Sequence, residues 1–386
     1  MSQNDFSFIN KKIFLLSPER WSNMRRSKHN YAIELAKMGN KVFFLEPANV
    51  KTKEISVHEI IKDALWVVNY PLIARGKNIL PAFFYNQIVK YEVKKITQHL
   101  NAVPDVVWSF DPVRIDRIAF FKKAIKIFHP VDFWNEKQFP SKKAFDIAFS
   151  PMQKQVDIFN ENGYKTFFIN HGLSEQFVKY SLEKLKDIHH DLPAHSDRKI
   201  NVGYVGSLIS EPPDRDVMKM VIEDNPDLTF HFWGEYEKDI VKAAYFHPEF
   251  ISYLQAKENV KLYGSADTET IARSIAPMDI FWMCWKTNEN SMWNSDTNPH
   301  KIIEYLSTGK PVVTHFMKKY LNTNLLYMCA EENNKNLYLE LFNSAIFNIT
   351  KGENIDKIKE RIQYALDNTY QKQIQRISFY INQHLN

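Results

Sequence analysis

Short apolar runs alternate with amphipathic stretches through the first half of the chain. Residues 12–17 (KIFLLS) form a continuous apolar run of the kind found in buried parallel strands. Residues 24–38 fit a helix that Gly39 would end, and residues 41–45 (KVFFL) fit a second strand. The pattern predicts a β-α-β unit with short connections. Other candidates are strands at residues 106–109, 126–128, 147–149 and 166–169 and a helix around residues 83–98.

A second alternating series occupies the other half of the chain. It follows a polar stretch that contains HHDLPAHSDRK, which we interpret as a linker. Strand and helix candidates then alternate, and the C-terminal residues are amphipathic and helical. The simplest interpretation is two successive α/β domains of similar size. We predict domains at residues 1–175 and 199–353, a linker at 176–198, and a C-terminal helix at 354–386.

The composition is that of an ordinary globular protein. The chain has 386 residues, of which 44% are hydrophobic and 25% charged, and these values exclude extensive disorder. Two cysteines are too few for a disulfide framework, and no apolar run reaches the roughly 18 residues needed to span a bilayer. The first residues lack the apolar core of a signal peptide. We therefore expect a cytoplasmic protein, either soluble or peripheral on a membrane.

The net charge narrows the range of partners. A formal charge of +5 and a pI near 8.8 are modest for a nucleic-acid-binding domain, and no stacking motif or dense basic arm is visible. The same charge is compatible with an anionic membrane surface or an anionic substrate. We expect no nucleic-acid partner.

The segment NSDTNPHKIIEYLSTGKPVVTH carries the most informative pattern. Asn298 suits a helix N-cap, Pro299 the first helical position and Gly309 the end of the helix. Lys301 and Glu304 are three residues apart and share one helix face. An anion at the helix N-terminus would be held by free N–H groups and Lys301, while Glu304 could accept hydrogen bonds from a ribose diol. The alternative, a surface Lys–Glu pair on an ordinary helix, stays open on spacing alone.

NPHKIIEYLSTGKPVV resembles the donor-binding motif of GT-B glycosyltransferases. Many retaining members of that superfamily carry two acidic residues separated by seven others. The second would be Glu304, and the first would be Asp296, where the family usually has Glu. The resemblance implies that Glu304 binds the donor ribose, that Lys301 binds phosphate, and that Asp296 lies near the transferred sugar.

Three further segments, NVGYVGSL, PDLTFHFWGE and NVKLYGSADTETIARSIAPMDIFWMCW, resemble the same donor domain in order and spacing. Together with the motif above they cover roughly residues 198–315. The resemblance implies a glycine that lets the backbone approach a diphosphate and a turn at the nucleobase. The alternative is a generic Rossmann-like domain of unrelated function. The implied donor-binding residues are Gly206, Ser207, Gly234, Tyr263, Asn298, Lys301 and Glu304.

The N-terminal half resembles bacterial GT-B enzymes that make capsule, exopolysaccharide or teichuronic-type glycans, in the segment IFLLSPERWSNMRRSKHNYAIELAKMGNKVFFLEP. In that fold Arg25, Arg26, Lys28 and His29 would face the interdomain cleft. They could bind donor phosphates or an anionic acceptor. A solvated basic face is the alternative.

Glycosyl transfer can require a group that deprotonates the acceptor hydroxyl. Asp132 and His129, in KIFHPVDFWNE, follow one predicted strand, and Asp111 in SFDP is a third candidate. We choose Asp132 as base or acceptor-orienting group and His129 second, although Asp132 could instead cap a loop. The segment at His171-Gly172 resembles one that crosses toward the donor domain, where a structural or donor contact is expected.

We expect no metal requirement. Asp214 and Asp216 have the form of an Asp-x-Asp motif, but they lie at a predicted helix start, where carboxylates suit the macrodipole. The acidic and imidazole side chains of the predicted linker read as a solvated polar loop. Those residues are His189, His190, Asp191 and His195.

Two stretches could contact a membrane. Residues 114–128 (RIDRIAFFKKAIKIF), as a helix, could lie on an anionic bilayer with Phe120 and Phe121 dipping in. A surface helix packed on its own domain is the alternative. A second candidate surface combines residues 82–85 (AFFY) with Lys90, Lys94 and Lys95.

The sequence therefore predicts an α/β protein of the GT-B type, with two Rossmann-like domains facing across a cleft and a C-terminal helix that crosses back. The N-terminal domain would bind the acceptor and the C-terminal domain a nucleotide diphosphate sugar. The expected activity is hexosyl transfer to a saccharide acceptor, lipid-linked, in bacterial surface glycan synthesis, with no cofactor beyond the donor. Two alternatives remain: a nucleotide-sugar 2-epimerase of the same fold, and a non-catalytic nucleotide-sugar-binding assembly subunit.

Overall fold

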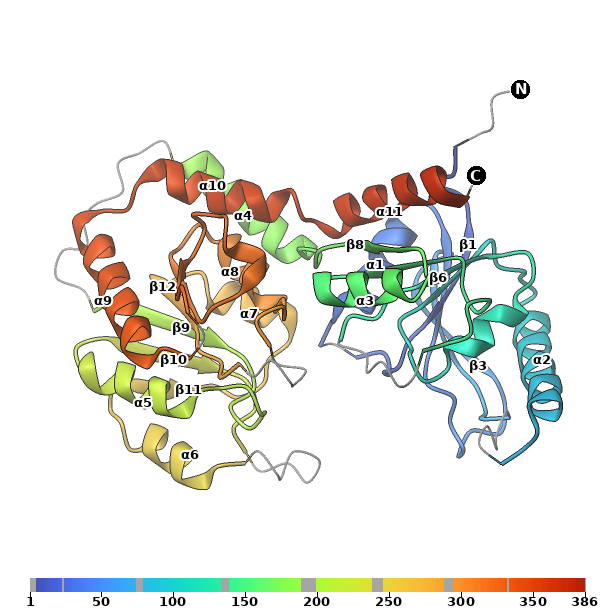
Figure 1. The fold of residues 1–386 in the computed structure, drawn as a ribbon, viewed down its shortest axis with the longest axis horizontal. Coiled ribbons are helices and arrows are strands. Elements are labelled where there is room, and N and C mark those ends of the chain that lie inside the picture. The colour runs from blue at the N-terminus through green and yellow to red at the C-terminus, as the bar shows by residue number, and fades with distance from the viewer. Residues whose placement is uncertain are drawn as a thin grey trace. The chain divides into compact units, whose positions relative to one another are not determined.

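The computed structural model describes residues 5–22, 24–73, 79–132, 139–188, 199–237, 246–287, 294–331 and 333–385. The chain forms two compact units. The first contains Met1–Gly172 and Tyr370–Asn386, and the second contains Leu173–Thr369. Each unit is an α/β domain with its own sheet (Figure 1).

The first unit is built on an eight-stranded sheet in the order β3-β4-β2-β1-β5-β6-β7-β8, parallel except for the β3–β4 pair. Its strands are β1 (Lys12–Leu16), β2 (Lys41–Leu45), β3 (Ser56–Ile61), β4 (Leu65–Asn69), β5 (Val106–Ser109), β6 (Ile125–Phe128), β7 (Ile147–Ser150) and β8 (Thr166–Phe168). Its helices are α1 (Ser27–Lys37), α2 (Ala82–His99), α3 (Gln153–Glu161), α11 (Tyr370–Leu385) and the 3₁₀ helix η1 (Ile115–Phe120).

Strand β1 shows why the sequence reads as a continuous apolar run. Ile13 and Leu15 pack in one cluster with residues of α1 and α11. Phe14 and Leu16 point to the other face and pack with residues of α2, η1 and α3. Helices cover both faces of the sheet, so the side chains on both faces of β1 are apolar. In a half-exposed strand every second residue would be polar instead.

The second unit has a six-stranded parallel sheet in the order β11-β10-β9-β12-β13-β14. Its strands are β9 (Asn201–Val205), β10 (Thr229–Trp233), β11 (Val260–Leu262), β12 (Ile280–Met283), β13 (Val312–Thr314) and β14 (Tyr327–Met328). Its helices are α4 (Glu175–Asp187), α5 (Arg215–Asp224), α6 (Pro248–Gln255), α7 (Thr268–Ser274), α8 (Lys301–Leu306), α9 (Lys335–Lys351), α10 (Ile355–Leu366) and the 3₁₀ helix η4 (Lys318–Tyr320).

Two predicted boundaries differ from the observed elements. Helix α4 starts at Glu175 and covers the first part of the predicted linker, because its residues Phe177 and Ser181 are buried in the second unit. The predicted C-terminal helix is two helices, α10 and α11, separated at residues 367–369. Helix α11 belongs to the first unit, since Ile374, Ile377 and other residues of its apolar face join the core around β1.

Residues 114–128 do not form the amphipathic helix that we expected. The segment contains η1, a turn and strand β6. Ile118 and Phe121 are buried, at 0% and 6% exposure, so the apolar side chains of this segment pack inward. The antiparallel β3–β4 hairpin was not predicted, because the mostly exposed strand β3 lacks an apolar pattern.

Candidate functional site

The predicted donor residues of the second unit gather at the carboxyl ends of its central strands. Strand β9 lies between β10 and β12, so successive connections leave it in opposite directions. Such a topological switch point is where open α/β sheets bind ligands. Gly206 follows β9 and Gly234 follows β10, and Gly206 N–H donates to the Trp233 carbonyl at 2.8 Å.

Gly234 brings two of these turns into close backbone contact. Its φ is +150°, and a Cβ added there would lie 2.0 Å from the carbonyl oxygen of Gly206. A side chain at this position would therefore push the two turns apart. Beside them, the buried Oγ of Ser207 has no hydrogen-bond partner among the described residues.

Tyr263 extends the same edge through a row of stacked rings. Its ring stacks on Trp233, with 4.8 Å between centroids and 13° between planes. Its hydroxyl lies 2.9 Å from His231 Nδ1, and His231 Nε2 lies 2.9 Å from Asn201 Oδ1. The side chain is held in place while the residue remains 49% exposed. An exposed, fixed ring edge next to Gly234 is suited to bordering a planar ligand.

Helix α8 begins later than the sequence indicated. Asn298 is not the N-cap: that position is His300, and Pro299 accepts a hydrogen bond from Ile302 N–H at 3.1 Å. Asn298 is buried, at 6% exposure. With six residues, α8 is too short for a strong helix dipole, so charge at this end must come mainly from side chains. Gly309 ends the segment as expected, with a φ of +73°.

Lys301 and Glu304 form an ion pair on α8. Lys301 Nζ donates to Glu304 Oε2 at 2.8 Å, and their side chains are 23% and 12% exposed. His300 Nε2 lies 4.0 Å from the other carboxylate oxygen of Glu304. The pair presents a cation and an acceptor side by side, each partly open to a ligand.

A tyrosine that the sequence analysis did not single out anchors this helix to the sheet. The Tyr305 hydroxyl accepts a hydrogen bond from Val205 N–H at 2.7 Å, and its ring stacks on Phe281 with centroids 4.4 Å apart. Val205 lies beyond the point where β9 stops pairing with β12 at Gly203, so its amide has no strand partner on that side. Tyr305 thus fixes the position of Glu304 next to the end of β9. In the sequence, the only signal of this role was the tyrosine of the EYL segment.

Asp296 lies in the loop before α8 and is partly neutralised. Lys318 Nζ lies 3.3 Å from Asp296 Oδ2, and the Asp296 side chain is 19% exposed. Its N–H donates to Asn294 Oδ1 at 3.0 Å, which holds the loop. Asp296 is therefore a carboxylate held in place by Lys318 and by the Asn294 turn.

The first unit carries a charged cluster at the corresponding edge of its own sheet. Strands β1, β5 and β6 are neighbours, so the loops that follow them lie together. Glu19, after β1, accepts hydrogen bonds from Arg26 Nη1 at 2.7 Å and from Lys28 Nζ at 2.8 Å. Lys28 is buried at 3% exposure, and burial lowers its pKa while Glu19 opposes the shift. Arg25 is exposed.

Asp132, after β6, lies within electrostatic reach of this cluster. It is exposed to solvent, but the surrounding protein atoms remove part of its hydration and raise its pKa. The charges of Lys28 and Arg26 act in the opposite direction, and Glu19 adds to the rise. The structure thus brings together three of the predicted residues: Asp132 from the loop after β6, Arg26 from the start of α1, and Lys28 from the first turn of α1.

His29 and His129 have packing roles that the sequence did not reveal. His29 is fully buried; its Nδ1 accepts from Arg26 N–H at 3.1 Å, and its Nε2 faces the Arg20 carbonyl at 3.2 Å. His129 lies among aromatic rings, with Phe110 stacked on it at 5.0 Å. Burial lowers the pKa of His29 to about 4 and that of His129 to about 3, so both are neutral near pH 7. We therefore omit both from the ligand and base assignments.

Asp111, the third candidate base, is part of a buried ion pair. It is 1% exposed and pairs with Arg114 Nε, and its other oxygen accepts from Val113 N–H at 2.9 Å. Arg114 also donates to the Ser17 carbonyl at 3.1 Å. These contacts hold the loops after β1 and β5 together and leave Asp111 a structural role.

His171 lies near His129, whose pKa it helps to lower, and its carbonyl accepts from Gln373 Nε2 at 3.3 Å.

The Asp-x-Asp sequence behaves as a helix start. Asp214 caps α5 by accepting from Val217 N–H at 3.2 Å, and Asp216 pairs with Lys335 at 2.9 Å. Among the described residues, no group of three or more His, Cys, Asp or Glu side chains could hold a metal ion. The imidazole-rich run from His189 to His195 lies outside the described residues.

Comparisons with known proteins give likeness in structure alone. No family model matches the chain, and no curated protein matches it. A glycosyltransferase from Rickettsia africae is 13% identical, with a TM-score of 0.68, and the match covers 96% of this chain and 98% of that one. Trehalose 6-phosphate synthase from Burkholderia multivorans is 9% identical, with a TM-score of 0.68 and coverage of 97% and 99%. Anabaena HepE, solved with UDP and glucose, is 14% identical, with a TM-score of 0.62 and coverage of 96% and 99%.

Proposed function

We propose that this chain, which has the GT-B fold of those enzymes, is a glycosyltransferase that moves a hexose from a nucleotide diphosphate sugar to a saccharide acceptor. The observation that carries the proposal is the edge of the second sheet, where Tyr305 fixes the Lys301–Glu304 pair beside the turn at Gly206. The neighbour HepE has been solved with UDP-glucose, and a trehalose-6-phosphate protein from E. coli with UDP-2-fluoro glucose, which supports a nucleotide-sugar donor.

The Lys301–Glu304 pair suits the two ends of a ribose diphosphate. An ammonium group can neutralise a diphosphate oxygen, and a carboxylate can accept both hydroxyl hydrogens of a ribose. At 12% exposure the Glu304 side chain is shielded enough for such bonds to exclude water, and Lys301 Nζ already donates to its carboxylate. The close turns at Gly206 and Gly234 leave backbone, not side chains, facing the diphosphate.

We assign Asp132 to the acceptor. A raised pKa brings a carboxyl group closer to the range in which it can take a proton from a hydroxyl during transfer. Arg26 and Lys28, paired through Glu19, would place positive charge near an anionic acceptor or the leaving phosphate. Asp296, tethered by Lys318, would lie by the transferred sugar. The acceptor we propose is lipid-linked, in bacterial surface glycan synthesis on the cytoplasmic side of the membrane.

The donor assignment is tested by thermal unfolding in the presence of UDP-, GDP-, CMP- and dTDP-sugars. A ligand that binds the folded state raises the melting temperature by mass action. We expect a rise with one nucleotide family, lost in Glu304→Ala and retained in Glu340→Ala, a control at an exposed residue of α9. If folded protein shows no rise with any donor, or if both variants respond like the parent, the donor site is misassigned.

Replacing Asp132 by Asn separates transfer from mere binding. Asn keeps the size of the side chain but cannot take a proton. We expect the donor-induced rise to persist and transfer, measured as release of the nucleotide in the presence of acceptor, to fall at least about hundredfold. Unchanged biological activity in the variant would favour a non-catalytic assembly subunit. Conversion of the free nucleotide sugar without an acceptor would favour the epimerase.

A further inference from the structure

Helix α2 has an outward face that is both aromatic and cationic. Phe83 and Phe84, in its first turn, are 67% and 60% exposed, and Tyr91 is 51% exposed. Lys90, Lys94 and Lys95 are exposed on the same helix. At 100° per residue, positions 83, 90 and 94 fall on one line along the helix, with 84, 91 and 95 beside them.

The one acidic residue of α2 points the other way. Glu92 is 1% exposed, and Arg117 Nη1 donates to its carboxylate at 2.5 Å. Val89, Val93 and Ile96 share the buried side and pack against the first sheet. The polar side of α2 therefore carries positive charge without a compensating acid on the same helix.

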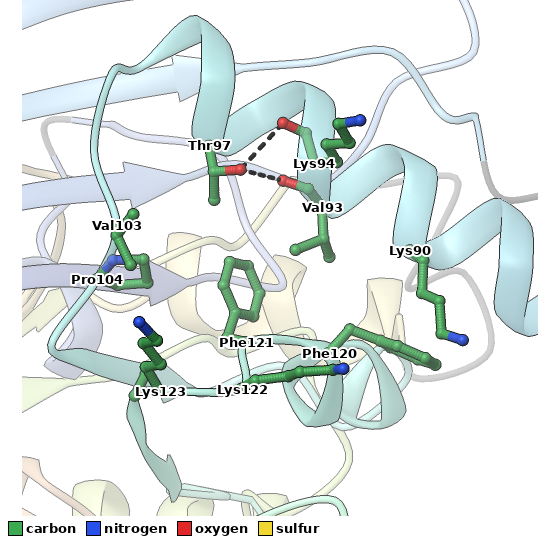
Figure 2. Close-up of a pocket in the computed structure, with 11 residues that line it drawn as sticks. Lys90, Val93, Lys94, Thr97, Val103, Pro104, Phe120, Phe121, Lys122 and Lys123 are labelled. Carbon is green, nitrogen blue, oxygen red and sulfur yellow. Dashed lines mark hydrogen bonds between the residues drawn. The ribbon is translucent and has the colours of Figure 1, made fainter.

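A pocket next to this face adds two more cations. It lies between α2 and the turn after η1, has a volume of about 310 Å³, and is open to solvent. Lys90 and Lys94 line it from the helix, and Lys122 and Lys123 from the turn (Figure 2). Phe121 forms part of its apolar floor, and none of its eleven lining residues is acidic. The two stretches that the sequence marked separately thus meet in one surface.

We propose that this surface, named here the α2 face, docks on an anionic lipid bilayer. The α2 face consists of Phe83, Phe84, Lys90, Tyr91, Lys94, Lys95, Lys122 and Lys123. Aromatic rings are favoured at the boundary between headgroups and acyl chains, and lysines are drawn to anionic headgroups. The pocket takes the phosphate of one anionic lipid, with its four lysines around it.

The extent of the α2 face favours a bilayer over a small soluble anion. Its 18-residue helix is about 27 Å long, and the exposed rings and lysines are spread along it. A soluble anion would fill the pocket but would leave Phe83, Phe84 and Tyr91 in water. A bilayer engages the cations and the aromatic rings together. In a glycosyltransferase with a lipid-linked acceptor, such docking would hold the enzyme at its substrate, but the inference does not depend on that activity.

Vesicle sedimentation tests the proposal directly. The full chain is mixed with vesicles of phosphatidylcholine alone or of phosphatidylcholine with 30% phosphatidylglycerol, and the bound fraction is measured. We expect binding to the anionic vesicles only, weakened by salt because exposed charges are screened. In the quadruple variant Lys90→Gln, Lys94→Gln, Lys122→Gln, Lys123→Gln, the partition coefficient should fall roughly hundredfold or more.

A matched control separates this surface from net charge. The variant Lys179→Gln, Lys261→Gln, Lys351→Gln, Lys357→Gln removes the same charge from exposed sites of the second unit and should bind like the parent. Phe83→Ser with Phe84→Ser should weaken binding at high salt, where charge contributes least. Equal loss in both quadruple variants, no binding to anionic vesicles, or binding that inorganic phosphate abolishes at low millimolar concentration would each overturn the proposal. Thermal unfolding verifies that every variant is folded.

Discussion

Removing one hydroxyl group, in Tyr305→Phe, tests how the second unit positions α8. The ring would keep its stacking on Phe281, so the change is confined to the hydrogen bonds with Val205. The phenol accepts from Val205 N–H at 2.7 Å and donates to the Val205 carbonyl at 3.4 Å. Tyr305 is 0% exposed, so no water can replace the lost group without a local opening.

The expected cost follows from leaving a buried amide unpaired. Such a group costs about 1–3 kcal/mol, and we expect about 2 kcal/mol here, because the amide of Val205 has lost its strand partner where β9 and β12 separate. For a unit of this size, each kcal/mol lowers the melting temperature by about 2–4 °C. The melting temperature of the second unit should therefore fall by about 4–8 °C.

Differential scanning calorimetry of the full chain measures this effect, and Tyr31→Phe is its matched control. Tyr31 is also buried, at 1% exposure, but its hydroxyl has no partner among the described residues. Its removal should leave stability unchanged or raise it slightly, since an unpaired buried hydroxyl is costly. If the two variants shift the melting temperature equally, the Tyr305 hydrogen bonds do not stabilise the second unit as expected. The donor-induced rise should also shrink in Tyr305→Phe, because Glu304 is the adjacent residue.

Two further predictions concern the first unit. The folded-state pKa values of His29 and His129, about 4 and about 3, lie below the ordinary value of 6.5. Below pH 6.5 these histidines therefore bind protons in the unfolded chain before they do so in the folded chain. Their contribution to stability is complete above pH 6.5 and declines as the pH falls toward 4, by up to about 1.4 kcal/mol per pH unit for each histidine. Urea unfolding between pH 5 and 6.5 should show this slope, and His129→Phe should reduce it while His58→Gln, at an exposed site, should not. Asp111→Ala should lower the free energy of unfolding by about 3–5 kcal/mol, because it leaves the buried Arg114 without its carboxylate partner. Asp216→Ala is the control: its ion pair has a carboxylate that is 75% exposed, and the loss should be less than about 1 kcal/mol. Similar losses in the two variants would refute the structural role of Asp111.

The predicted α/β fold with two Rossmann-like units is confirmed, and the reason is visible in single strands. The run KIFLLS is apolar at consecutive positions because both faces of β1 are covered. The order of residue types after Asn298 likewise indicated a helix, a glycine that ends it and a strand, although α8 begins at Lys301. Local signals of this kind predict the observed elements because they follow from backbone geometry and from the burial of apolar side chains.

The roles of the candidate residues were harder to read because they depend on contacts between distant segments. We predicted His129 and Asp111 as candidate bases and His29 as a ligand for an anion, but burial and contacts with Phe110, Arg114 and Arg20 give them structural roles. Likewise, residues 114–128 have the composition of a surface helix, yet Ile118 and Phe121 are drawn into the core. Nothing in the local sequence distinguishes these outcomes, since the neighbours that bury each group come from other strands and helices.

The amino-acid pattern by itself determined the class of fold, the place of the candidate donor motif and the presence of aromatic and basic residues on α2. Those properties arise from hydrophobic periodicity and from short-range spacing. Packing decided which charges remained available: Glu92 was turned inward to Arg117, while Lys90, Lys94, Lys122 and Lys123 all line one pocket that is open to solvent. It also placed Tyr305 against Val205, 100 residues earlier in the chain. Such pairings minimise the free energy of the whole unit, in which each buried polar group needs a partner wherever along the chain that partner lies.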